Sequence, residues 1–116
     1  MTQPGLVPVQ TTPSVSLRGV IRAPGDKSIS HRALIIAALA TGRSHIKGLL
    51  VADDLTRTAN ALRQCGVVIG VGKEGDWEID GVGIGGLIEA ADVLDLGNSG
   101  TAVRLLMGVL ASHPLQ

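Results

Sequence analysis

The segment PGDKSISHR (Pro24–Arg32) runs directly into ALIIAALA (Ala33–Ala40), and this junction decides the fold. The pattern predicts a helix over 28–41, capped at its start by Asp26 or Ser28 and followed by a glycine. Because the second half of this helix is apolar on almost every side, we expect it to be buried on most of its surface.

The remaining chain alternates between strand and helix patterns. Strands are predicted at 16–25, 44–51, 67–71, 77–80 and 93–97, and further helices at 53–66 and 98–112. Asp53 and Asp54 favour the start of the second helix by capping and through the helix dipole, and GKEGD (72–76) predicts the turn of a hairpin. The order β-α-β-α-β-β, followed by β-α, indicates an α/β fold in which a second unit begins and is not finished.

The start of the first helix is a candidate anion site. Lys27 and Ser28 lie where helix amides point outward, and Arg32 shares a face with Ser28 because the two are four residues apart. A point cation, a hydroxyl and a guanidinium fork at one helix start suit a ligand rich in anionic oxygens. A capping serine beside solvated cations is an equally good interpretation of this spacing. His31 either orients the loop by a hydrogen bond or shuttles protons.

Two nucleotide-binding patterns are excluded by their context. GVGIGG (81–86) fits G-x-G-x-x-G, but neither a long helix nor a suitably spaced acidic residue follows it, so we interpret it as a flexible turn. PGDKS (24–28) fails the spacing of the phosphate loop G-x-x-x-x-G-K-[ST].

LGNSGTAVR (Leu96–Arg104) forms a second candidate anion site at another predicted helix start. Gly100 has no Cβ, so a ligand can approach the backbone there, and Asn98 offers a donor beside it. Ordinary helix capping is the alternative. Two such helix starts, each after a strand of one repeating unit, predict a shared cleft for anionic ligands.

Composition narrows the function classes. Residues 1–47 hold six cations and one anion, whereas residues 48–116 hold four cations and nine anions. This asymmetry indicates either an anionic ligand for the first half or pairing between the halves. The 116 residues are formally neutral and contain one aromatic residue, Trp77, which argues against nucleic-acid binding. A single cysteine, Cys65, and no long apolar run predict a cytoplasmic protein that does not span a membrane.

At the motifs GDKSISHR (25–32) and LGNSGTAVR (96–104), the sequence resembles the 5-enolpyruvylshikimate-3-phosphate synthase family of enolpyruvyl transferases. The resemblance runs from about Leu17 to Ala111 and includes GLLVADDLTRTANALRQCGV (48–67). It implies transfer of the enolpyruvyl group of phosphoenolpyruvate to the 5-hydroxyl of 3-phosphoshikimate, with release of phosphate. The reaction serves chorismate and aromatic amino acid biosynthesis, and it needs no cofactor and no metal.

The resemblance also implies a role for individual residues. Lys27 is expected to lie between both substrates and to act in catalysis. Ser28 and Arg32 are expected to bind 3-phosphoshikimate, whereas Asn98 and Gly100 are expected to bind phosphoenolpyruvate. Arg104 matches an arginine of the family whose role is interpreted as structural.

The resemblance implies the enolpyruvyl transferase fold, a monomer of two domains built from β-α-β-α-β-β units around an active-site cleft. We therefore expect a lead-in at 1–13, a first strand and interdomain hinge at 14–25, and a partial domain at 26–116. This chain is then an N-terminal piece of a longer enzyme and is inactive alone, because the later proton-transfer residues are absent from it. The sister family that acts on UDP-N-acetylglucosamine and a non-catalytic anion-binding module are the alternatives.

Overall fold

The computed structural model describes residues 5 and 7–115, and its first helix starts where the sequence predicts. α1 (Lys27–Leu39) is capped by Asp26, whose Oδ1 accepts a hydrogen bond of 2.8 Å from the N–H of Ile29. Leu34 and Ala38 are fully buried on the face that packs on the sheet and on the second helix. The capping prediction is confirmed for Asp26, which leaves Ser28 free of that task.

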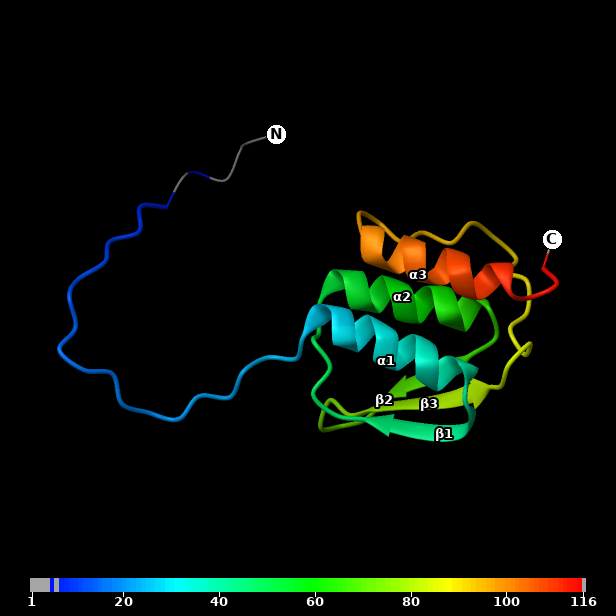
Figure 1. The fold of residues 1–116 in the computed structure, drawn as a ribbon, viewed down its shortest axis with the longest axis horizontal. Helices are drawn as coiled ribbons and strands as arrows, with labels where there is room; N and C mark the ends of the chain where they lie inside the picture. The colour runs from blue at the N-terminus through cyan, green and yellow to red at the C-terminus, as the bar shows by residue number, and fades with distance from the viewer. Residues whose placement is uncertain (1–4, 6, 116) are drawn as a thin grey trace.

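A three-stranded sheet lies beneath the helices, as Figure 1 shows. β1 (Thr41–Ile46) and β2 (Val68–Val71) flank β3 (Trp77–Val82), which pairs antiparallel with both of them. Ile79 and Trp77 of β3 point into the core, at 0% and 5% exposure. The predicted hairpin is confirmed, because the N–H of Gly72 bonds to the carbonyl of Asp76 at 2.7 Å.

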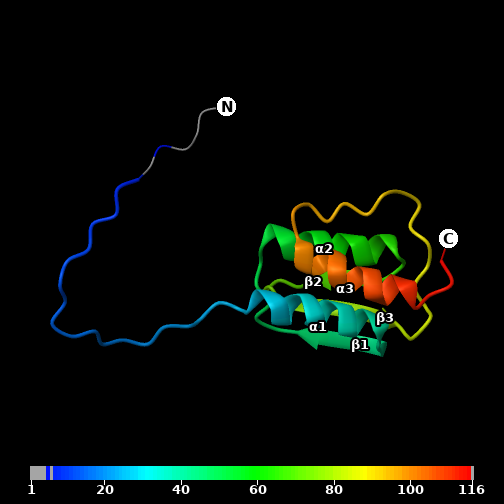
Figure 2. The ribbon, with the colours of Figure 1, turned by 45° about the horizontal axis from the view of Figure 1, so that its top comes forward.

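α2 (Asp53–Gln64) lies beside α1 on one face of the sheet, and α3 (Gly100–Ala111) packs against α1 farther from the sheet (Figures 1 and 2). α2 buries Leu55, Ala59 and Leu62 at helical spacing, and Cys65 follows it in the core. Its predicted side-chain cap is wrong: the capping position is Ala52, which makes no side-chain hydrogen bond. α3 is capped by Ser99, whose Oγ accepts from the N–H of Ala102 at 3.2 Å.

Two predicted strands are absent, which corrects the sequence analysis. Leu17, Val20 and Ile21 in the segment 16–25 are at least 90% exposed, and Val93 in the segment 93–97 is 81% exposed. A strand needs a neighbouring strand for its backbone hydrogen bonds, and among the described residues neither segment has one. The lead-in at 1–13 lies partly outside the described residues, and its described part is exposed chain without a helix or strand.

Other corrections concern boundaries and burial. The strand predicted at 44–51 is found at Thr41–Ile46, because Gly48 turns the chain with a φ of +75°. The outer face of α1 is not buried: Ile29 and Ile36 are 68% and 66% exposed, since no described element packs on that side.

The turn predicted at GVGIGG (81–86) is confirmed. The segment ends β3 and then turns, with the N–H of Gly86 bonded to the carbonyl of Gly83 at 3.2 Å. No helix in the described residues has the length and hydropathy needed to cross a membrane.

Candidate active site

The three helices begin at the same end of the molecule, as the two ribbon views show (Figures 1 and 2). Their unpaired N–H groups and the positive ends of their dipoles therefore gather at one end. The predicted site residues are all exposed there: Lys27, Ser28 and Arg32 at the start of α1, and Asn98 and Gly100 at the start of α3. This end of the fold is thus suited to anionic groups.

Lys27 is held by a carboxylate of the neighbouring helix. Its Nζ contacts Asp54 in the first turn of α2, and the two side chains are 52% and 16% exposed. The bond from Lys27 lowers the pKa of Asp54, so this carboxylate stays ionised over the physiological pH range. From the sequence, Asp54 was expected only to favour the start of α2, and its contact with the amine of Lys27 was not predicted.

A second polar bridge joins α1 and α2 one turn further on. His31 Nδ1 lies 2.9 Å from Thr58 Oγ1, and that hydroxyl donates to the carbonyl of Asp54 at 3.2 Å. Since the hydroxyl proton is used there, the network assigns the imidazole proton to Nδ1 of His31. The ring is fully buried, and burial lowers the pKa of His31. A buried neutral imidazole suits an orienting hydrogen bond better than proton shuttling.

The two serines of the first motif face opposite ways. Ser30 is 2% exposed, and its Oγ donates to the carbonyl of Asp26 at 2.6 Å and accepts from the N–H of Leu50 at 3.0 Å. Ser28 is exposed, and its hydroxyl has no hydrogen-bond partner among the described residues. Its carbonyl accepts from Arg32 Nη1 at 3.1 Å, so the guanidinium of Arg32 lies next to the backbone of Ser28. Ser28 is therefore the serine available to a ligand.

The start of α3 leaves space beside Gly100. A Cβ at this position would meet the guanidinium of Arg104, 3.0 Å from Nη1, and no other residue within 4 Å. Ser99 is buried as the helix cap, whereas Asn98 is exposed beside it. The N–H groups of Gly100 and Ala102 are bonded within the chain, which leaves the N–H of Thr101 in this turn. The second motif thus combines this amide, an open approach and a nearby cation, which is an arrangement that accepts an oxyanion.

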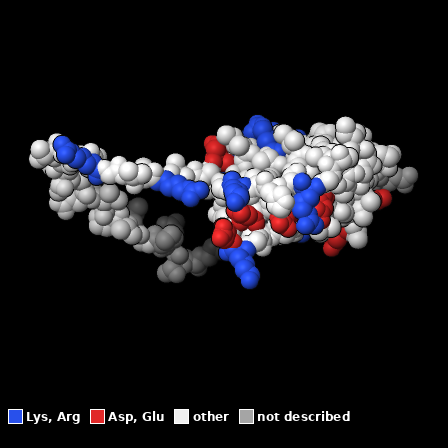
Figure 3. Space-filling view, turned by 90° about the horizontal axis from the view of Figure 1, so that it is seen from below, with Lys and Arg blue, Asp and Glu red and all other residues white. Residues whose placement is uncertain are grey.

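Part of the basic half pairs with the acidic half, which confirms one of the two explanations for the charge asymmetry. Arg43 makes a bidentate ion pair with Asp80, at 2.6 and 2.9 Å, and Lys47 lies 3.2 Å from Asp76. Seen from below, blue and red side chains lie next to one another on the folded part (Figure 3). Arg32 has no ion-pair partner in the described part of the chain, so it stays available to an anion.

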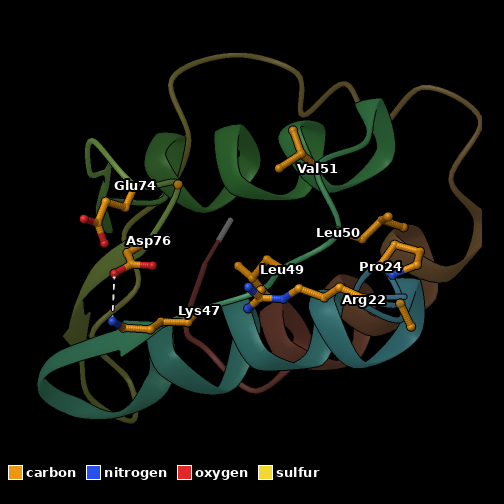
Figure 4. A pocket seen from close by; sticks show the side chains of 12 residues that line it. Arg22, Pro24, Lys47, Leu49, Leu50, Val51, Glu74 and Asp76 are labelled. Atoms are coloured by element: carbon orange, nitrogen blue, oxygen red, sulfur yellow. Dashed lines mark ion pairs between the residues drawn. The ribbon is translucent and has the colours of Figure 1, made fainter. Parts of the chain in front are cut away.

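A cavity of about 770 Å³ opens at the same end of the fold, between the chain segments that precede α1 and α2 and the β2–β3 turn. Figure 4 shows Arg22 and Pro24 on one side of it and Glu74 and Asp76 on the other. None of the predicted site residues lines this cavity. Its charges include the Lys47–Asp76 ion pair, so it offers less to an anionic ligand than the helix starts do.

Comparison with known proteins agrees with the motifs. A family model described as EPSP synthase (3-phosphoshikimate 1-carboxyvinyltransferase) matches residues 11–116. A relative of that enzyme name from Sphingopyxis alaskensis is 50% identical over 115 residues, which are 99% of this chain and 26% of the relative. Another from Gluconobacter oxydans is 59% identical over 98 residues, which are 84% of this chain and 22% of the relative.

A solved structure is also similar. The EPSP synthase from Acinetobacter baumannii superposes with a TM-score of 0.74 and is 46% identical, over 79% of this chain and 21% of that one. This match confirms the predicted fold class, an incomplete arrangement of repeated α/β units. The chain spans about a quarter of the length of the curated relatives it matches.

Proposed function

The chain belongs to the EPSP synthase family, and from this premise we propose that the whole protein transfers the enolpyruvyl group of phosphoenolpyruvate to the 5-hydroxyl of 3-phosphoshikimate. The products are the enolpyruvyl ether and phosphate. The observation that carries this proposal is the grouping of the exposed Lys27 and Gly100 motifs at the end where all three helices begin.

Both proposed substrates are phosphorylated anions, and the two helix starts divide the task of binding them. Ser28 and Arg32 bind 3-phosphoshikimate, because the exposed hydroxyl and the guanidinium lie on one face of α1. Asn98 and Gly100 bind the phosphate of phosphoenolpyruvate, because the start of α3 offers the positive end of its dipole and the N–H of Thr101 beside an open approach.

Lys27 lies at the start of α1 and contacts both substrates in this proposal. In the addition, the hydroxyl oxygen bonds to C2 of phosphoenolpyruvate, the hydroxyl loses its proton and C3 gains one, which gives a tetrahedral intermediate. In the elimination, C3 loses a proton and the double bond forms again as phosphate leaves. A cation held by Asp54 is already in place when negative charge builds up on the phosphate leaving group, so no reorganisation is needed then. The proposed reaction needs no cofactor.

We extend the proposal to the cell and to assembly. The only cysteine is a free thiol buried in the core, which fits a reducing compartment such as the cytoplasm. The whole enzyme is proposed to act as a monomer, with its cleft formed within one chain.

Phosphate release by the whole protein tests the proposal. Lys27→Ala is expected to lower kcat/KM by about 100-fold or more, the effect of removing one charge-stabilising group. Lys47→Ala is the matched control, because Lys47 is also an exposed lysine paired to an aspartate and belongs to neither motif. Equal activity of both variants would contradict the assignment. Turnover with UDP-N-acetylglucosamine in place of 3-phosphoshikimate would favour the sister reaction instead.

A further inference from the structure

The loop between β3 and α3 (83–99) contains no strand, yet it must hold the start of α3 in place. Leu94 and Leu96 are partly buried against the core, but Gly97 and Asn98, which lead from them to the start of α3, are exposed. Apolar burial therefore does not fix the final approach to Gly100. A polar contact from α2 is available for that task.

Arg57 on α2 joins this helix to the loop. Its Nε lies 2.9 Å from Asp53 Oδ2 on the same helix, and its Nη1 lies 3.0 Å from Asp95 Oδ2 in the loop. The other oxygen of Asp95 accepts a hydrogen bond of 2.8 Å from the N–H of Gly97. The contacts thus run from Asp53 through Arg57 and Asp95 to the backbone three residues before Gly100.

Gly97 lies directly against this guanidinium. A Cβ at position 97 would lie 2.7 Å from Arg57 Nε and 2.8 Å from its Cδ. The φ of Gly97 is +59°, a left-handed value that glycine adopts without steric cost. The chain therefore turns over the Arg57 side chain, and the turn leads into Ser99, whose N–H bonds to the carbonyl of Leu96 at 3.2 Å.

The charges of Asp53, Arg57 and Asp95 favour the contacts described above. Asp53 holds the guanidinium of Arg57 in place, which leaves Nη1 directed at Asp95. The N–H of Gly97, and then the charge of Arg57, lower the pKa of Asp95. The carboxylate is therefore ionised at neutral pH and can hold both partners together.

We propose that Arg57 and Asp95 are positioning residues that set the place of Asn98 and Gly100 for phosphoenolpyruvate. The functional half of this inference, that the pair affects phosphoenolpyruvate binding, rests on the proposed function. The structural half, that the pair holds the backbone before Gly100, does not. The sequence offered no signal for the pair, because 38 positions separate the two residues and no regular spacing links them. Only the packing of the loop on α2 brings them together.

Amide hydrogen exchange of the 116-residue chain tests the structural half. Arg57→Met and Asp95→Asn are expected to speed exchange at Gly97 and Ser99 about two- to fivefold, the size of effect typical of an exposed ion pair. Arg43→Met is the matched control, because it breaks another arginine–aspartate pair with solvent-exposed side chains, on the sheet. Unchanged exchange in Arg57→Met and Asp95→Asn, or the same change in Arg43→Met, would overturn the structural half of the proposal.

Steady-state kinetics of the whole protein test the functional half. Arg57→Met is expected to raise the KM for phosphoenolpyruvate about two- to fivefold and to leave the KM for 3-phosphoshikimate unchanged, whereas Arg43→Met changes neither. Arg57→Lys restores part of the effect, because it keeps the charge and loses the fork. Equal rises in both KM values would overturn the positioning role. An inactive wild-type enzyme would overturn the proposed function, and hydrogen exchange would still decide whether Arg57 and Asp95 hold the loop.

Discussion

Replacement by alanine is expected to have opposite effects at the two serines of the first motif: loss of stability at Ser30 and loss of substrate binding at Ser28. Ser30→Ala removes the acceptor of the Leu50 N–H and the donor to the Asp26 carbonyl. That carbonyl keeps a bond of 3.0 Å from the Ser30 N–H, so the group left without a partner is the N–H of Leu50. An unsatisfied, partly buried N–H lowers the free energy of unfolding by about 1–2 kcal/mol. Ser28→Ala is expected to change it by less than about 0.5 kcal/mol, because its hydroxyl is exposed and unbonded among the described residues.

Urea unfolding followed by the fluorescence of Trp77 measures this difference. Trp77 is the only aromatic residue of the chain and is 5% exposed in the core, so its emission reports on the fold. In thermal unfolding, the loss of unfolding free energy in Ser30→Ala corresponds to a fall in Tm of about 5–10 °C. Calorimetry of the whole protein with 3-phosphoshikimate gives the opposite ranking, with weaker binding in Ser28→Ala.

The reasoning fails if the two variants are equally stable, because the Leu50 contact would then contribute nothing to folding. It also fails if Ser30→Ala weakens 3-phosphoshikimate binding and Ser28→Ala does not. Ser30→Thr is a control that keeps the hydroxyl at this position.

Further outcomes follow from the same structure. Since burial holds the pKa of His31 below 6.5, the unfolded chain binds this proton more readily, so the free energy of unfolding falls as the pH drops below about 6.5; an equally steep fall in His31→Gln would contradict this. Gly100→Ala meets only the flexible side chain of Arg104, so we expect unchanged thermal stability and a higher dissociation constant for phosphoenolpyruvate in the whole protein; an unchanged constant would count against the placement of this substrate. Gly25→Ala puts its Cβ 2.2 Å from the backbone oxygen of Gly48, and the unfolding midpoint in urea should fall by the equivalent of about 2 kcal/mol; wild-type stability would refute that contact. The 116-residue chain by itself is expected to release no phosphate from the two substrates, and measurable release would contradict the assignment of proton transfer to residues outside it.

Local features of the fold were predictable because they depend on neighbouring residues. The Asp26 cap, the helical spacing of α2 and the turn between β2 and β3 are set by contacts within a few positions. The strands predicted at 16–25 and 93–97 were wrong because a strand exists only with a partner, and partnership is not a local property.

The candidate site divides in the same way. Lys27 and Gly100 were identifiable because a helix start exposes amides wherever it occurs, and the residues there are read directly from the motif. Asp54 and Arg57 were not identified as their supports, because their partners lie on other elements of the fold. The two bridges between α1 and α2, Lys27–Asp54 and His31–Thr58, have the same sequence separation of 27, as two parallel helices in register require, but this regularity identifies the pairs only once the helices are known to pack side by side.

By itself, the sequence determined where the helices begin and which side chains stand at their starts, since caps, glycines and periodicity act over a single turn. Tertiary structure decided which of those side chains stay free. Packing buries Ser30 and His31 and leaves Ser28 and Arg32 exposed, although all four belong to one motif. The reason is that exposure depends on what the second helix and the Leu49–Leu50 chain cover, and those segments approach α1 only after the chain has folded.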